Sequence, residues 1–285
     1  MTNSNYTTSK SILNGEITFI SAVNNVAQLS TEKEVHIHYD QVEIYYFLDG
    51  DLYFAFEGKQ IPVEKGSIVI IDSGTLHRPI IKSKKRYERK RIKISKNIFH
   101  RFNTAEYDLY SNIHKRKILI FTPDTLAKSG CDKLFSEIET SINKNTPYEN
   151  FSALLNIFSL LLKAVKYSKS EIFTSSEIKS NKTEEILKFI NQNLNENLTY
   201  KSLAKRFYIS EKNLYKIFKK ETGFTLSEYI KERRIIMAIS LLNSGISACE
   251  AAEQTGFSDY SVFYRLFIKK VGMKPSDYYK KENRK

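Results

Sequence analysis

The chain has 285 residues and a net charge of +13, with 41% hydrophobic and 27% charged residues, a composition typical of a globular protein of about two domains. No apolar run approaches the roughly 18 residues of a membrane span, and the first residues lack the basic and apolar pattern of a secretory signal, so we expect a cytoplasmic protein without membrane contacts. Cys131 and Cys249 lie far apart, which argues against a disulfide framework or a cysteine-based zinc site.

Short strands are predicted for much of the N-terminal half. Between about residues 17 and 94 the chain contains brief aromatic and β-branched segments, such as 43–48, 52–56 and 67–71, separated by Gly-containing turns. Many short strands at close spacing are typical of a small barrel or jelly roll.

Two segments of this half leave alternatives open. The residues before Ile17 form either a disordered tail, which we favour, or an arm that rearranges when a ligand binds. The basic run at 82–91 (KSKKRYERKR) either contacts DNA or, as we favour, forms a solvated strand and turn.

Two helices are predicted after the strands, at about 132–143 and 148–167. The second has a broad apolar face, so we expect either burial within its own domain or pairing with a second copy in a homodimer. The segment 168–182 is rich in Ser and Lys and lacks a sustained periodicity. It is predicted to be a linker between an N-terminal domain, 1–167, and a C-terminal domain, 183–285.

From residue 183 onward the pattern is helical and basic. Residues 181–285 hold 20 Lys and Arg against 12 Asp and Glu, so they carry +8 of the net charge. Positive charge attracts a phosphate backbone, although on its own it also serves solubility.

The first part of this region has the pattern of a helix-turn-helix unit. A short helix capped by Thr199 precedes a second helix capped by Ser210, and such a pair places its second helix in the major groove of DNA. Gly223 is expected to end that helix, and Thr225 to open a longer helix that runs to about Asn243. At 1.5 Å per residue, roughly 18 residues make a spacer of about 27 Å.

A second unit repeats the first. Residues 214–229 read LYKIFKKETGFTLSEY and residues 263–278 read FYRLFIKKVGMKPSDY, with identical residues at six of sixteen positions. The offset is 49 residues in the helices but 48 between Ser210 and Ser258, which we take to cap the second recognition helix. One extra residue is therefore expected at the start of that helix, and the two units are predicted to read different half-sites.

These features resemble the paired helix-turn-helix domain of AraC/XylS-type transcription regulators. Residues 251–281, AAEQTGFSDYSVFYRLFIKKVGMKPSDYYKK, carry the Gly-Phe, Phe, Arg, Phe, Lys pair, Gly, Pro-Ser and Tyr of the family signature, with departures at Ile268 and Lys280. The resemblance implies a sequence-specific regulator of transcription, more often an activator. Its implied partners are double-stranded DNA and RNA polymerase.

The family's pattern also implies which residues contact DNA. Arg and Lys pair with guanine, and aromatic rings pack on thymine methyl groups. The expected base contacts are Lys212, Tyr215, Lys216, Tyr260, Ser261, Tyr264 and Arg265. The expected phosphate contacts, which position the protein without reading sequence, are Ser210, Lys219, Ser258 and Lys269. The alternative for some of the base contacts, among them Lys212, Lys216, Tyr260, Tyr264 and Arg265, is a solvated surface position.

The N-terminal half contains the spacing of the two cupin motifs. His36, His38 and Glu43 resemble the first motif, and His77 completes the second. Three His and one Glu inside a barrel could hold Fe, Mn, Ni or Zn. However, Asp72 stands where metal-binding cupins usually have Pro. Ile81 and Ser30 likewise replace the usual Asn and Gly.

AraC-type sensor domains often resemble cupins while they bind small organic effectors. We therefore expect no cofactor, with metal binding by His36, His38, Glu43 and His77 as an alternative and purely structural hydrogen bonds as another. The expected effector pocket is formed by His36, His38, Glu43, Tyr45, Phe47 and His77.

The sequence thus predicts two domains: an all-β cupin-like barrel with following α-helices, and an all-α domain with two helix-turn-helix units. The predicted function is a transcription regulator, not an enzyme, modulated by a small polar effector such as a sugar. The alternatives are a metal-dependent cupin enzyme fused to a DNA-binding domain, and a ligand-independent regulator controlled by a protein partner.

Overall fold

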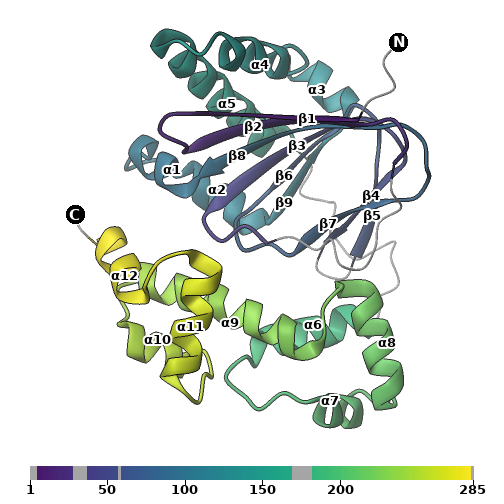
Figure 1. Ribbon diagram of the computed structural model, residues 1–285, viewed down its shortest axis with the longest axis vertical. Helices are drawn as coiled ribbons and strands as arrows, with labels where there is room; N and C mark the ends of the chain where they lie inside the picture. Colours follow the sequence, from purple (N-terminus) through teal and green to yellow (C-terminus); the bar gives the residue numbers. More distant parts are fainter. Residues whose placement is uncertain (1–4, 28–36, 57–58, 169–181, 284–285) are drawn as a thin grey trace. The chain divides into compact units, whose positions relative to one another are not determined.

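The computed structural model describes residues 5–27, 37–56, 59–168 and 182–283. They form two compact units, one on each side of the predicted linker. The N-terminal unit has strands followed mostly by helices, and the C-terminal unit is helical in its described part, which confirms the predicted two-domain fold class (Figure 1). Within the described ranges, no helix is long and apolar enough to cross a membrane.

Two sheets make up the strands of the N-terminal unit (Figure 1). One has the order β1-β2-β8-β3-β6-β9 and the other the order β5-β4-β7. The strands are β1 (Tyr6–Ile12), β2 (Ile17–Asn24), β3 (Gln41–Asp49), β4 (Leu52–Phe56), β5 (Lys59–Val63), β6 (Ile68–Ile71), β7 (His77–Ile81), β8 (Tyr87–Ser95) and β9 (Ile118–Phe121).

Alternation along the strands of the six-stranded sheet sends side chains to two hydrophobic cores. On β3, Val42 and Ile44 pack with the helices, whereas Tyr45 and Phe47 pack with residues of the three-stranded sheet. Tyr87 of β8 joins the second core. The odd-numbered residues of β3 and β8 therefore lie on the face between the two sheets, which we call the inner face.

The helices of the N-terminal unit pack on the opposite face of the six-stranded sheet. They are α1 (Lys96–Phe102), α2 (Leu109–Arg116), α3 (Pro123–Lys128), α4 (Leu134–Lys144) and α5 (Pro147–Tyr167). The last two agree with the helices predicted at 132–143 and 148–167. The first three, and β9, were not predicted, because elements of four to eight residues are too short to display a clear periodicity.

The predictions at the edges of this unit need correction. Tyr6–Ile12 is not a disordered tail but the edge strand β1, paired with β2 over its whole length. Its first six side chains are exposed, so no apolar alternation marked it as a strand. The basic run at 82–91 forms a connecting loop and the first part of β8, as favoured, but the strand is not fully solvated, because Tyr87 is buried.

The predicted linker, 168–182, adjoins a helix at each end. Ser168 caps the end of α5 and is buried, and Lys182 already begins helix α6. The rest of the predicted linker, 169–181, lies outside the described residues.

The C-terminal unit contains the predicted helices of both helix-turn-helix units. These helices are α6 (Lys182–Gln192), α7 (Tyr200–Arg206), α8 (Glu211–Thr222), α9 (Leu226–Asn243), α10 (Ala248–Gln254), α11 (Tyr260–Val271) and α12 (Pro275–Asn283). Thr199, Ser210 and Thr225 cap their helices as predicted, and Gly223 ends α8 at a φ of 76°. Such positive φ angles are where glycine is least strained.

The predicted cap of the second recognition helix is wrong by one residue. Asp259, not Ser258, is the N-cap of α11, and its carboxylate accepts the backbone N–H of Ser261 at 2.6 Å. Because Ser210 and Asp259 are 49 residues apart, α8 and α11 have equal lengths of 12 residues and no extra residue at their starts. The extra residue lies in the turn, 255–259, against 207–210 in the first unit.

Candidate nucleic-acid interface and sensor site

Helix α8 presents one polar face and buries the other. Leu214 and Phe218, four residues apart, are fully buried and fix the rotation of the helix. The predicted base contacts Lys212, Tyr215 and Lys216 consequently lie on the exposed side. Tyr215 is 47% exposed, and its ring lies 5.8 Å from that of Tyr200 in α7.

Helix α11 repeats this arrangement with different side chains. Phe263 and Phe267 occupy the buried positions. The predicted base contacts on this helix, namely Tyr260, Ser261, Tyr264 and Arg265, share the opposite side: Tyr264 is half-buried and the others are exposed. The structure therefore gathers each predicted set of base contacts on one helix face.

The predicted phosphate contacts fall into two groups. Ser210, Ser258 and Lys269 are exposed, and the Ser210 hydroxyl also accepts the Asn213 N–H at 3.3 Å as a cap. Lys219 is different, because its ammonium group donates to the Gly223 carbonyl at 2.9 Å. A role of Lys219 in DNA binding therefore competes with a bond that closes the end of α8.

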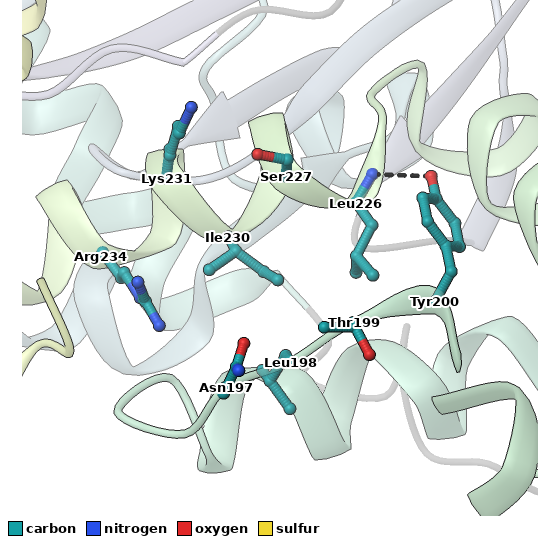
Figure 2. A pocket seen from close by; sticks show the side chains of 9 residues that line it. All are labelled: Asn197, Leu198, Thr199, Tyr200, Leu226, Ser227, Ile230, Lys231 and Arg234. Carbon is teal, nitrogen blue, oxygen red and sulfur yellow. Dashed lines mark hydrogen bonds between the residues drawn. The ribbon is translucent and has the colours of Figure 1, made fainter. Parts of the chain in front are cut away.

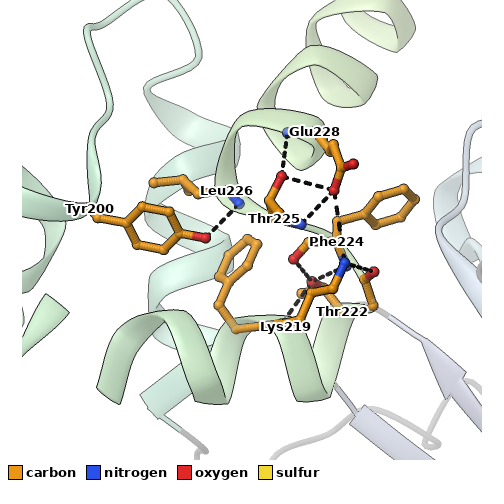
Figure 3. Close-up of polar contacts among 9 residues, drawn as sticks. Tyr200, Lys219, Thr222, Phe224, Thr225, Leu226 and Glu228 are labelled. Carbon is orange, nitrogen blue, oxygen red and sulfur yellow. Dashed lines mark hydrogen bonds and ion pairs between the residues drawn. The ribbon is translucent and has the colours of Figure 1, made fainter. Parts of the chain in front are cut away.

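The junction between α8 and α9 is a network of short-range hydrogen bonds (Figure 3). The Thr225 hydroxyl accepts the Glu228 N–H while the Glu228 carboxylate accepts the Thr225 N–H at 2.8 Å, which is a complete capping box. These bonds to Thr225 hold the pKa of Glu228 below its ordinary value. The Tyr200 hydroxyl accepts the Leu226 N–H at 2.9 Å, so α7 is also tied to the start of α9.

Helix α9 also forms one wall of a cavity of about 330 Å³ (Figure 2). Leu198, Leu226 and Ile230 supply apolar lining, and Arg234 lies at one side. The Arg234 guanidinium donates to the carbonyls of Leu194 at 2.9 Å and Glu196 at 3.0 Å. Arg234 therefore anchors the connection between α6 and α7 to the middle of α9.

In the N-terminal unit, Glu43 is the centre of a buried polar cluster. Its Oε2 atom lies 3.2 Å from Nε2 of His38 and 3.0 Å from Nε2 of His77. Nδ1 of His77 lies 2.9 Å from the Thr75 carbonyl, which only accepts, so Nδ1 is a donor. Burial would raise the pKa of Glu43, but the hydrogen bonds and charges of the two histidines outweigh burial and hold it well below its ordinary value.

The other predicted pocket residues have different surroundings. Tyr45 and Phe47 lie on the inner face next to Glu43, but both are almost fully buried in the second core. The Tyr45 hydroxyl is hydrogen-bonded to that of Tyr87, and its ring meets Phe54 edge-on at 5.0 Å. His36 lies outside the described residues. The structure thus brings together three of the six predicted residues, with Tyr45 and Phe47 as part of the packing beneath them.

Two cations of this site were missed from the sequence. Lys93 is paired with Glu43 in the strand register and Arg91 with Tyr45, so both lie on the inner face. An Arg91 Nη atom lies 3.7 Å from Oε1 of Glu43. Burial lowers the pKa of Lys93, Glu43 opposes that shift and Arg91 adds to it. The alternation of Arg89, Arg91 and Lys93 with apolar Ile92 and Ile94 was the available signal.

The cluster fits a metal ion in its donor atoms. His38, Glu43 and His77 each offer a ligand atom, all within 4.8 Å of one another, and the Thr75 carbonyl orients His77 as outer partners of metal ligands do. A bound ion would supply Lewis acidity at this point. The charge of the site disfavours a bound metal ion, because Arg91 and Lys93 place two cations beside the same carboxylate.

Two parts of the chain match known families. Residues 203–281 match the family described as helix-turn-helix domain, and residues 26–88 match the cupin domain family.

Several relatives are named as regulators. The chain is 32% identical over 154 residues to the Msm operon regulatory protein of Streptococcus mutans, a match that covers 52% of this chain and 55% of that protein. It is 25% identical over 257 residues to the uncharacterized HTH-type transcriptional regulator YdiP of Escherichia coli, covering 85% of this chain and 80% of YdiP. The chain spans about half or less of the length of several relatives that it matches.

Among solved structures, fatty acid-bound ToxT of Vibrio cholerae is 18% identical, with a TM-score of 0.39 and coverage of 98% of this chain and 97% of that one. The two family matches lead to one conclusion: the chain combines an N-terminal cupin domain with a C-terminal helix-turn-helix domain of the AraC type.

Proposed function

We propose that this protein is a sequence-specific DNA-binding transcription regulator whose N-terminal unit binds a small polar effector. The observation that carries the proposal is the pair of equal recognition helices, α8 and α11, each with a buried apolar side and an exposed basic and aromatic side. Arg265 and Lys216 occupy equivalent exposed positions in the two helices and would donate to guanine edges. The net charge of the C-terminal region supports the same proposal.

The direct test is selection of binding sites from random double-stranded DNA, followed by fluorescence anisotropy with the selected site and a scrambled one. We expect an enriched asymmetric site and tighter binding to it, on the order of a thousandfold, than to scrambled DNA at physiological salt. Equal affinity for both sequences would contradict a sequence-specific function.

The regulator is proposed to act as a homodimer through α5. Along this helix Tyr148, Phe151, Leu155 and Leu162 are between 44% and 79% exposed and lie on one side. A row of large exposed apolar residues on one helix is typical of a protein–protein interface. In sedimentation analysis a Leu155→Lys and Leu162→Lys double variant should be a monomer, whereas Lys84→Ala, at an exposed position in the loop before β8, should leave the oligomeric state unchanged.

Activation through RNA polymerase in the cytoplasm completes the proposal, in line with the relatives named as transcription regulators. A reporter gene placed behind the selected site should be transcribed more strongly when the protein is present. Lower transcription would identify a repressor and leave the DNA-binding function intact.

The grouping of His38, Glu43 and His77 favours one second candidate, a metal-dependent cupin enzyme with a DNA-binding domain. Metal analysis of the purified protein separates the two. We expect no stoichiometric metal. A tightly bound ion that is lost in both His38→Ala and His77→Ala would support the enzyme instead.

A further inference from the structure

The inner face of β8 carries more positive charge than the buried acid beside it balances. Arg91 and Lys93 are two residues apart on this strand, and both lie opposite residues of the predicted effector pocket. Glu43 is the single carboxylate that the described residues place with them, and it is already hydrogen-bonded to two histidines. The cluster therefore holds the two cations Arg91 and Lys93 against one carboxylate.

Two buried atoms of the cluster have no hydrogen-bond partner among the described residues. They are Oε1 of Glu43, an acceptor, and Nε of Arg91, a donor. Glu43 is only 2% exposed, so solvent does not explain the missing partner of Oε1. Because buried polar atoms are almost always paired, this site lacks one group that donates and one that accepts.

A single ligand that pairs both atoms carries both kinds of group. Arg91 and Lys93 match an anionic oxygen, since guanidinium and ammonium groups donate but never accept. Oε1 of Glu43 matches a hydroxyl group, which donates one hydrogen bond. A metal ion would satisfy Oε1 but not the Nε–H group of Arg91.

We propose that the sensor site binds a small organic anion that also carries a hydroxyl group, such as a sugar acid or a sugar phosphate. The anionic group binds Arg91 and Lys93, and the hydroxyl donates to Glu43. His38, Arg91 and Lys93 are partly exposed, so a ligand can reach them, whereas His77 and Glu43 are buried. This inference rests on the proposed function in one respect: the bound anion is taken to be the effector of the regulator.

The test uses the full chain and four probes in thermal-shift and calorimetric titrations. Gluconate and glycerol phosphate carry both an anionic group and hydroxyls, sorbitol lacks the anion, and hexanoate lacks the hydroxyls. We expect binding of gluconate or glycerol phosphate, and binding of sorbitol and hexanoate that is weaker by about tenfold or more. Preference for gluconate would identify a carboxylate as the anionic group, and preference for glycerol phosphate would identify a phosphate.

Matched variants locate the binding. Arg91→Gln and Lys93→Gln should each weaken binding of the preferred probe by about tenfold, because each removes one charged contact. Lys90→Gln is the control on the same strand, because Lys90 points to the other face and is bonded to Glu139 in α4 at 2.6 Å. The Lys90→Gln variant should bind the preferred probe with unchanged affinity.

Several outcomes would overturn the inference. They are binding of sorbitol as tight as that of gluconate, no binding of either hydroxylated anion, or an equal loss in Lys90→Gln. DNA binding measured on the same preparations keeps this failure separate from failure of the proposed function. Retained site-specific DNA binding without any response to the probes would refute the anion and leave the regulator standing.

Discussion

The two helix-turn-helix units of the C-terminal domain are built from helices of equal length joined by different turns. α7 and α10 each have 7 residues, and α8 and α11 each have 12. The turn of the second unit is one residue longer. The duplication has therefore preserved the recognition helices and changed the connection that orients them.

The turns also differ in how they are packed. Tyr208 and Gly256 take the same place after α7 and α10, and both have positive φ angles, 53° and 84°. Tyr208 is 92% exposed, whereas Gly256 packs so tightly that an added Cβ would lie 2.7 Å from the Leu194 carbonyl. Since Arg234 holds that carbonyl, Gly256 packs against the body of the domain, whereas the equivalent Tyr208 lies exposed at the surface.

The largest expected effect tests this contrast directly. Gly256→Ala should lower the free energy of unfolding by about 3 kcal/mol, because it adds overpacking to the strain of a left-handed backbone. Tyr208→Gly should change it by less than about 1 kcal/mol, because relief of strain offsets the greater freedom of the unfolded chain. Urea unfolding measures both.

Equal effects of the two substitutions would show that the turns are equally constrained. Tyr208→Ala serves as the control for loss of the exposed ring alone. It should behave like Tyr208→Gly within the same range.

Base reading should also differ between the units. Arg265→Ala should cost about 2 kcal/mol of DNA binding and relax the preference at one base pair, because a guanidinium pairs with guanine through two hydrogen bonds. Lys216→Ala, at the equivalent place in α8, should cost less, since an ammonium group lacks the planar fork. Anisotropy titrations with sites altered at single positions measure both, and equal losses on specific and random DNA would rule out base reading by Arg265.

The sequence located both recognition helices because independent signals coincided there. Leu214 and Phe218 gave a helical period, and Ser210 and Gly223 marked the ends. At the second helix the end signal was ambiguous, because Ser258 and Asp259 are adjacent and are both good N-cap residues. The structure shows that Asp259 is the N-cap. The extra residue of the second unit therefore lies in the turn and not at the start of the helix.

The sensor site was harder to predict because strand register decides which side chains meet. His38, Glu43 and His77 were found through their motif spacing, and the structure brings them together. Arg91 and Lys93 were missed because a shift of one residue between β3 and β8 would have turned both to the other face. The spacing of motif residues along the sequence does not specify how β3 and β8 are paired.

The corrected cap makes a smaller prediction. Asp259→Ala should destabilise the domain by about 1 kcal/mol through loss of the hydrogen bond to the Ser261 N–H, and Ser210→Ala should cost a similar amount in the first unit. Ser258→Ala should leave stability nearly unchanged, because Ser258 is exposed and lies outside the helix. Thermal unfolding of the three variants measures this. A larger loss in Ser258→Ala than in Asp259→Ala would restore the cap expected from the sequence.

The smallest expected difference concerns the two lysines predicted to contact phosphate. Lys269 is exposed near the end of α11, whereas Lys219 is bonded to Gly223 and occupies the place of Ile268 in the repeat. Removal of one phosphate contact lowers the slope of log affinity against log salt by about 0.9. We expect that change for Lys269→Ala and a smaller one for Lys219→Ala, measured by anisotropy over a salt series. The same full change in both variants would mean that the Lys219 ammonium leaves the Gly223 carbonyl when DNA binds. In that case both units would contact the DNA backbone through a lysine, despite the different bonding of Lys219 and Lys269 in the free protein.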